Sequence, residues 1–279
     1  MKALTKIFLN VLGRTARPYL RAQGLLRVKK IFNRSALEWQ PSGERIVVLA
    51  PHMDDEVIGC GGTIARHVAK GSAVTVIFLT DGRLGGAASG LPARGTERSA
   101  GIASTRKDEA RRALGELGIS NAVFLDAKDG ELGATLELGE ALRDALVAAR
   151  PEIVYLPFFL EEHPDHRAAS ALLSAAVHGS SLNFRCHGYE VWTPLFPNCF
   201  VRIDDTIEAK RRALTHYQSQ LAEADYLHTS LGLNAFRSSA LSDGICRFAE
   251  AFYAVPLAEY LQQYRAYGGD AAAAGSPPA

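Results

Sequence analysis

Short apolar runs without polar alternation recur along this chain, and stretches with helical spacing separate them. Ile46–Ala50 and 153–159 are the clearest runs, and their β-branched and aromatic content is typical of strands buried on both faces of a parallel sheet. Two further runs predict strands over 73–79 and 122–125. Helical spacing predicts helices over 61–69, 104–117, 138–149, 167–177 and 207–221. Because strands and helices alternate with short links, the pattern predicts one α/β domain, a doubly wound and mostly parallel sheet with helices on both faces.

Polar clusters follow two of the predicted strands. Residues 51–56 (PHMDDE) come directly after the first run, and residues 163–166 (HPDH) follow the run at 153–159. In open α/β sheets, ligands bind at the carboxyl ends of the strands. Two strand ends that carry imidazoles and carboxylates therefore predict a metal site.

The residue types of these clusters suggest hydrolysis. A catalytic zinc takes three protein ligands and leaves one position open, and His52, one carboxylate of Asp54 and Asp55, and one of His163 and His166 supply them. Successive side chains of an extended segment point in opposite directions, so we expect one aspartate to bind metal and the other to face the water. Metal lowers the pKa of water toward about 7 while a carboxylate takes the proton. The second histidine would stabilise the developing oxyanion or protonate the leaving group.

A structural interpretation competes with this one. Acidic residues after a strand are also typical of a helix N-terminus, where Asp caps free N–H groups. Two such clusters at two strand ends favour a functional site. The remaining histidines lack this company and are expected to be surface or hydrogen-bonded core residues: His67, His178, His187, His216 and His228.

With residues 80–82 (TDG), the segments 46–71 and 163–166 resemble the PIG-L/LmbE-like family of zinc-dependent deacetylases, over about residues 44–255. The resemblance implies a Rossmann-like fold and removal of acetyl groups from molecules that contain N-acetylglucosamine. It also implies a zinc site, a general base and a residue that supports the tetrahedral intermediate. By that resemblance the zinc ligands are His52, Asp55 and His166, the base is Asp54, and the supporting residue is His163.

The same resemblance implies two substrate contacts, Arg106 at a helix start and Asp129 against a sugar hydroxyl. Met53 departs from the family pattern, which has proline there; its soft thioether is not counted as a ligand. The expected metal is Zn²⁺, although the same ligands accept Fe²⁺ or Co²⁺. The expected enzyme is a zinc-dependent N-deacetylase, with the same hydrolase acting on a non-sugar amide as an alternative.

A glycine-rich turn at 59–63 (GCGGT) suggests a different class of protein, a catalytically silent module that binds a nucleotide or glycan. The dinucleotide fingerprint would need a third glycine where the chain has Ile64. The acidic residues would also repel a pyrophosphate. We expect instead that these glycines let the helix pack close to the sheet.

Residues 1–34 hold nine Lys or Arg and no Asp or Glu, which leaves 22 basic and 30 acidic residues in the rest of the chain. Apolar residues recur in this segment at helical spacing, which predicts a basic amphipathic helix. Such a helix lies in the headgroup region of an anionic membrane or packs on the domain. We therefore divide the chain into an extension (1–43), a deacetylase domain (44–266) and a disordered tail (267–279).

Composition limits the partners and the cellular compartment that can be expected for this protein. Four separated cysteines give neither a disulfide framework nor a zinc knuckle, so a reducing cytoplasm is expected, with peripheral contact at the inner membrane face if the extension binds lipid. The expected substrate is a small molecule containing an amino sugar or a lipid-linked glycan, and no nucleic acid binding is expected.

A Gly/Ala/Ser-rich stretch at 82–101 is expected to be a substrate loop. Aromatic residues at 188–197, including Trp192, either stack on sugar or pack in the core.

Overall fold

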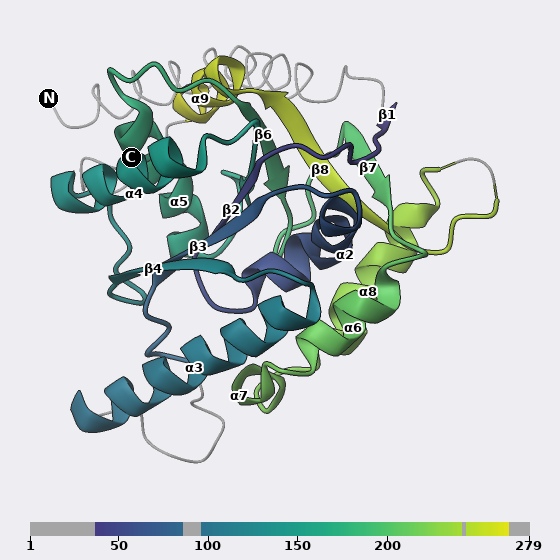
Figure 1. The fold of residues 1–279 in the computed structure, drawn as a ribbon, viewed down its shortest axis with the longest axis horizontal. Coiled ribbons are helices and arrows are strands. Elements are labelled where there is room, and N and C mark those ends of the chain that lie inside the picture. The colour runs from purple at the N-terminus through teal and green to yellow at the C-terminus, as the bar shows by residue number, and fades with distance from the viewer. Residues whose placement is uncertain (1–36, 86–95, 242–243, 268–279) are drawn as a thin grey trace, which may run out of the picture. The chain divides into compact units, whose positions relative to one another are not determined.

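The computed structural model describes residues 37–85, 96–241 and 244–267, which form an α/β unit (Figure 1). Its sheet has eight strands in the order β1-β7-β8-β6-β5-β2-β3-β4. The strands are β1 (Leu37–Glu38), β2 (Ile46–Ala50), β3 (Val74–Thr80), β4 (Asn121–Ala127), β5 (Ile153–Pro157), β6 (Arg185–Tyr189), β7 (Cys199–Arg202) and β8 (Ala249–Pro256). All neighbours pair in parallel except that β8 runs antiparallel to β6 and β7. The predicted mostly parallel sheet is therefore confirmed.

Helices cover both faces of this sheet. They are α2 (Asp55–Ala69), α3 (Thr96–Glu116), α4 (Leu136–Ala149), α5 (Pro164–Val177), α6 (Ile207–Leu214), α7 (Gln218–Leu221), α8 (Tyr226–Ser238) and α9 (Leu257–Ala266). Helices α4, α5 and α9 pack on one face, and α2, α3, α6 and α8 pack on the other (Figure 1). Strands β2, β3 and β5 are buried along their whole length, as expected of strands covered on both sides.

Three predicted helices have clearly different bounds in the structure. The helix expected over 104–117 begins at Thr96, inside the stretch that was expected to be a substrate loop. The helix expected over 61–69 begins at Asp55, because the glycine-rich turn continues the helix with only a kink at Cys60 (φ −148°, ψ 20°). The helix expected over 207–221 is interrupted, since Tyr217 has non-helical angles (φ −83°, ψ 56°) and separates α6 from α7. Strands β1, β6, β7 and β8 and helices α8 and α9 were not predicted.

The glycines of the 59–63 turn bring α2 against its neighbours. A Cβ added at Gly59 would lie 2.3 Å from the Tyr189 ring of β6, and one at Gly62 would lie 2.8 Å from Ile203. Both positions therefore serve close packing, as expected. Because Tyr189 and Ile203 occupy this space, the turn has no room there for a phosphate.

A buried ion pair connects α2, α6 and β8 below this turn. The Nζ atom of Lys210 lies 2.7 Å from Glu250 Oε1, and neither side chain is exposed to solvent. Glu250 also accepts hydrogen bonds from the backbone N–H groups of Gly62 (3.0 Å) and Thr63 (2.7 Å). Lys210 donates a second bond to the carbonyl of Ile58 (2.8 Å). The pair therefore fixes the kinked middle of α2, the helix that begins at the candidate site.

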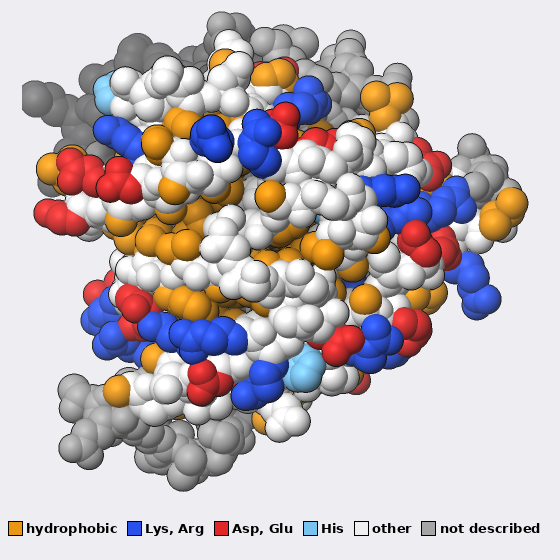
Figure 2. Space-filling model, in the orientation of Figure 1, with side chains coloured by type: hydrophobic (Ala, Val, Ile, Leu, Met, Phe, Trp, Pro, Cys, Tyr) orange, Lys and Arg blue, Asp and Glu red, His pale blue; other side chains and the backbone are white. Residues whose placement is uncertain are grey.

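The predicted amphipathic helix (1–34), most of the predicted extension (1–43) and nearly all of the predicted tail (267–279) lie outside the described residues, as does half of the predicted loop at 82–101. All four cysteines are free, in agreement with the sequence. Within the described ranges, no helix is both long and apolar enough to cross a membrane. On the face shown in Figure 2, basic and acidic side chains of the described residues are interspersed.

Candidate metal centre and active site

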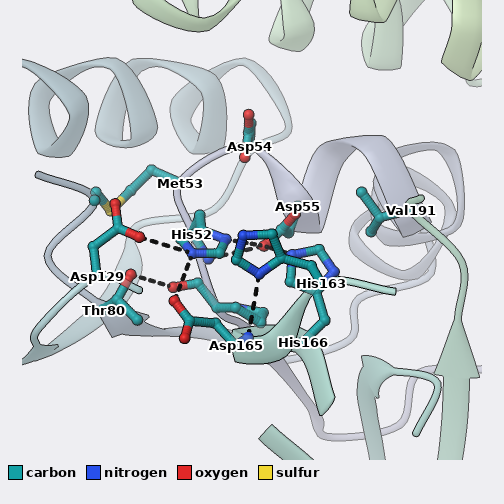
Figure 3. A network of polar contacts seen from close by, with 12 residues as sticks. His52, Met53, Asp54, Asp55, Thr80, Asp129, His163, Asp165, His166 and Val191 are labelled. Atoms are coloured by element: carbon teal, nitrogen blue, oxygen red, sulfur yellow. Dashed lines mark hydrogen bonds and ion pairs between the residues drawn. The ribbon is translucent and has the colours of Figure 1, made fainter. Parts of the chain in front are cut away.

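The two polar clusters meet because β2 and β5 are neighbours in the sheet. The first cluster connects β2 to α2, and the second connects β5 to α5. His163 is the N-cap of α5, where its Nδ1 accepts a hydrogen bond from Asp165 N (3.2 Å), and His166 lies in the first helical turn. Figure 3 shows the side chains of both clusters gathered at this edge of the sheet.

The two adjacent aspartates separate for a reason that the sequence did not indicate. We expected an extended segment with alternating side chains, and this was wrong: Asp55 is the first residue of α2, and Asp54 precedes it with φ 137° and ψ −28°. Such a backbone conformation costs a non-glycine residue on the order of 1–3 kcal/mol and persists only where its surroundings hold it. As a result Asp55 lies among the imidazole rings while Asp54 stands apart from them (Figure 3).

Two buried side chains, those of Glu56 and Arg106, hold the strained turn. The carboxylate of Glu56 accepts a hydrogen bond from Asp54 N (3.2 Å) and another from the hydroxyl of Tyr217. Arg106 donates to the carbonyls of Met53 (2.9 Å) and Gly82 (3.1 Å). Burial raises the pKa of Glu56 to about 8, and its bond from Tyr217 acts in the opposite direction.

Ring nitrogens of His52 and His166 converge on one carboxylate oxygen of Asp55, which makes these three residues the potential metal ligands. Asp55 Oδ2 lies 3.3 Å from His52 Nδ1 and 3.2 Å from His166 Nε2. Ligand atoms around a tetrahedral zinc, with bonds of about 2.0–2.2 Å, are roughly 3.3 Å apart. Both ring nitrogens of His166 are buried without a hydrogen-bond partner, although a buried polar atom normally has one. The distances and the unsatisfied imidazole therefore fit a bound divalent metal.

His163 also lies within reach of this centre. One ring nitrogen each of His52, His163 and His166 lies within 4.8 Å of the others. The ring of His163 is half-buried, and burial together with the nearby His52 and His166 lowers its pKa below the ordinary value. It therefore presents a neutral imidazole at the rim of the centre at neutral pH.

His52 is oriented by carboxylates on its far side. Its Nε2 lies 3.1 Å from Asp165 Oδ2 and 3.2 Å from Asp129 Oδ1. Asp165 in turn accepts hydrogen bonds from the backbone N–H groups of Gly130 (2.8 Å) and Leu132 (3.1 Å). A carboxylate at Nε2 fixes the proton there and leaves Nδ1 free to bind metal. Sequence reasoning missed Asp165, although it lies between the two histidines of the second cluster.

The carboxylates make this region favourable for positive charge. Burial would lower the pKa of His166, but the adjacent Asp55 raises it to about 9. Burial would raise the pKa of Asp165, but its hydrogen bonds from His52 and Gly130 bring it below the ordinary value. The raised pKa of His166 indicates a negative potential at the point where the ligand atoms converge, and the lowered pKa of Asp165 shows that its own anionic form is stabilised by its donors.

Asp54 has the environment expected of a base. It is buried, with 6% of its surface exposed, and burial raises its pKa to about 7, while Arg106, 3.7 Å away, acts in the opposite direction. A pKa near neutral pH suits a group that must accept and return a proton, and the adjacent guanidinium favours its ionised form. Asp54 lines a cavity of about 220 Å³, in which its carboxylate is available to a ligand.

This cavity brings together six of the seven predicted site residues: His52, Asp54, Asp55, Arg106, Asp129 and His163. His166, the seventh, is fully buried against Asp55. Arg106 was placed at a helix start, and this was wrong: α3 begins at Thr96, so Arg106 lies in mid-helix, where only 3% of it is exposed.

Comparisons with known proteins identify relatives of this chain. A family model described as "PIG-L: GlcNAc-PI de-N-acetylase" matches residues 47–177. The diacetylchitobiose deacetylase of Thermococcus kodakarensis is 33% identical over 199 residues, which cover 64% of this chain and 71% of that protein. The chain belongs to the PIG-L family. The resemblance drawn from its motifs is therefore confirmed.

Other PIG-L relatives extend the comparison. The 1D-myo-inositol 2-acetamido-2-deoxy-α-D-glucopyranoside deacetylase of Rhodococcus erythropolis is 33% identical over 181 residues, 56% of this chain and 60% of that enzyme. The crystal structure of the conserved protein TT1542 from Thermus thermophilus superposes with a TM-score of 0.63 at 30% identity and covers 75% of this chain and 94% of that one. This PIG-L chain thus shares the family fold and spans about 60–70% of the two curated relatives.

Proposed function

We propose that this protein is a zinc-dependent N-deacetylase that removes the acetyl group from an N-acetylglucosamine-type unit of a larger molecule. The observation that carries the proposal is the convergence of His52, Asp55 and His166 at distances suited to zinc, beside the carboxylate of Asp54. Two PIG-L relatives support the substrate class, because their names specify diacetylchitobiose and an acetamido-glucoside of inositol. Both named substrates join an N-acetylated amino sugar to a further group.

The roles of the site residues follow from their positions. Zinc at this centre would supply Lewis acidity toward the acetamide carbonyl and toward water. Asp54 takes a proton from the attacking water and passes it to the nitrogen as the amide C–N bond breaks, which gives acetate and a free amine. His163, at the rim of the cavity, donates a hydrogen bond to the oxygen that gains negative charge. Arg106 holds Asp54 in place and favours its ionised form.

Asp129 is proposed to hold a sugar hydroxyl while it supports His52. Its Oδ1 lies against His52 Nε2, and its Oδ2 accepts from the backbone N–H of Leu84 (2.9 Å). A carboxylate has about four lone-pair positions, so the two contacts leave acceptor capacity for a hydroxyl in the cavity. Arg106 is enclosed by its protein contacts, so only the part of its side chain that lines the cavity would contact the substrate.

The choice of zinc rests on the donor set of two imidazoles and one carboxylate, which is the set of several catalytic zinc sites. Fe²⁺ and Co²⁺ suit the same ligands, and availability decides between them. The free cysteines favour a reducing cytoplasm as the compartment. A lipid-linked glycan, with residues 1–34 at the membrane surface, is the narrower form of the proposal; deletion of 1–34 should then abolish binding to anionic liposomes.

The first test is acetate release from a panel of N-acetylglucosamine conjugates, with protein stripped of metal and reloaded with zinc. Zinc-dependent release from at least one conjugate is expected. Protein that binds one zinc per chain but releases no acetate would favour a non-sugar amide as substrate. Protein that binds no metal would overturn the assignment of both clusters.

A further inference from the structure

A second cavity adjoins the cavity of the metal centre. It has a volume of about 250 Å³ and shares Ile58, Val191, Trp192 and Tyr226 with the first. Its other walls come from Ala224 and from α8, where Leu233 lines the second cavity and not the first. The two spaces therefore adjoin at the Trp192 and Tyr226 rings, which meet edge to face (centroids 5.7 Å apart, 76° between planes).

The two cavities differ in chemistry. Imidazoles, carboxylates and a guanidinium line the first, whereas none of the described residues that line the second is charged. Its two aliphatic hydroxyls already donate their hydrogens within the protein, Thr229 to the carbonyl of Asp225 and Ser230 to that of Ile58, each at 3.2 Å. A sugar ring buried here would leave several hydroxyls without partners, and unpaired buried polar groups oppose binding. An apolar group would lose no hydrogen bond.

The wall between the cavities is held rigidly. The carboxylate of Glu161, 1% exposed, accepts backbone hydrogen bonds from Val191 (2.6 Å), Trp192 (3.2 Å) and Thr193 (3.2 Å). Because Glu161 fixes the backbone beneath it, the point from which Trp192 projects is set before a ligand arrives, although half of the Trp192 surface is exposed. A preordered backbone lowers the entropy cost of binding.

The size of the site points in the same direction. Small-molecule sites are typically about 300–1,000 Å³, and each cavity alone, about 220 and 250 Å³, falls below that range. Together they reach it. A ligand of ordinary size would thus occupy both, with its reacting amide at Asp54 and a second part between Trp192, Tyr226 and Leu233.

We propose that this second cavity is an aglycone subsite that takes an apolar group, aryl or alkyl, attached to the amino sugar. The inference rests on the proposed function for the reacting half of the substrate. It assigns the specificity of the enzyme to Trp192, Tyr226 and Leu233, outside the metal centre.

The test compares methyl, butyl and phenyl glycosides of N-acetylglucosamine, all of one anomeric form, with diacetylchitobiose as the sugar aglycone. With zinc-loaded protein, the phenyl glycoside should exceed the methyl glycoside in kcat/KM by about tenfold or more. Trp192→Ala and Leu233→Gln should each bring this ratio toward one. Phe236→Ala is the matched control. Phe236 lies on α8 with Leu233, is 66% exposed and lines neither cavity, so the ratio should stay at the wild-type value.

Two results would overturn the proposal: equal kcat/KM for all three simple glycosides, or diacetylchitobiose exceeding the phenyl glycoside with a Trp192-dependent advantage. If no glycoside is deacetylated, the proposed function fails and the subsite is tested by binding alone. Calorimetry with phenyl and methyl glucosaminides, which carry no acetyl group, should then give the phenyl compound the higher affinity in wild type. Loss of that difference in Trp192→Ala and Leu233→Gln would support the subsite, and its absence from wild type would refute it.

Discussion

Replacement of Asp165 by asparagine tests how the metal centre is oriented. Asp165 Oδ2 faces His52 Nε2 (3.1 Å) and Gly130 N (2.8 Å), and Oδ1 faces Leu132 N (3.1 Å). Asparagine has the same shape but only one oxygen, so its amide nitrogen must face at least one of these donors. Leaving a buried donor unpaired costs about 1–3 kcal/mol.

This change should weaken metal binding as well as folding. Loss of a hydrogen-bond partner behind a metal-binding histidine typically lowers metal affinity about 10–100-fold. Asp129 Oδ1 remains 3.2 Å from the same His52 nitrogen, so we expect Asp165→Asn to fall at the lower end, about tenfold. The double variant with Asp129→Asn should reach about 100-fold or more, because no carboxylate then faces Nε2. Competition with a chromophoric zinc chelator measures both.

The matched control is Glu250→Gln, which also removes a buried carboxylate that accepts backbone hydrogen bonds, but does so away from the metal ligands. It should lower the thermal midpoint and leave zinc affinity unchanged. Equal losses of zinc affinity in Glu250→Gln and Asp165→Asn would refute the reasoning, because the effect would then follow stability alone. Unchanged zinc affinity in Asp165→Asn, with a loss in Asp129→Asn, would assign the orienting role to Asp129.

Three further predictions address catalysis, stability and pH. Asp54→Asn should lower acetate release by about 10²–10⁴-fold with zinc content unchanged by metal analysis; equal loss of zinc would identify Asp54 as a ligand. Lys210→Met leaves the Glu250 charge buried and unpaired, so urea unfolding should show a loss of about 3–5 kcal/mol, part of which Lys210→Met/Glu250→Gln should restore. Burial lowers the pKa of His67 to about 4 from an ordinary 6.5. The unfolded chain therefore binds a proton at a higher pH than the folded protein does, and the free energy of unfolding declines as pH falls from 6.5 to 4. The loss should be about 2 kcal/mol at pH 5, and His67→Gln should flatten that part of the pH–stability curve; an unchanged curve would contradict the assignment.

The strands around the site could be predicted because each carries its own signal. Strands β2, β3 and β5 are buried on both faces, so they read as unbroken apolar runs. Strand β6 has the sequence Arg-Cys-His-Gly-Tyr and no such run, and it becomes a strand through pairing with β5 and β8. Strand β8 is apolar, but its antiparallel direction depends on partners more than 40 residues away. Tertiary context decides such strands.

The residues of the site also divide into those with a local sequence signal and those without one. His52, Asp54, Asp55, His163 and His166 could be proposed from sequence because their types and their positions after strands carry the chemistry. The structure brings them together, and their individual roles stay predictions. The supporting residues gave no local signal, because their partners are distant in the chain: Asp165 meets His52 across 113 positions, and Glu161 meets Val191 across 30. In sequence such acidic residues look like surface groups.

The charge balance of the cavity gives an argument for a metal that does not depend on the family. Four carboxylates, those of Asp54, Asp55, Asp129 and Asp165, lie at or beside the ligand atoms, and each has less than 9% of its surface exposed. Arg106 faces Asp54 at 3.7 Å, and the carboxylates raise the pKa values of His52 and His166 although burial acts in the opposite direction. Buried charges without partners are strongly unfavourable, so without a metal the protonated imidazoles balance part of the carboxylate charge. A divalent cation between Asp55, His52 and His166 would take the place of those protons, so zinc should raise the thermal midpoint of the protein by more than it raises that of Asp55→Asn.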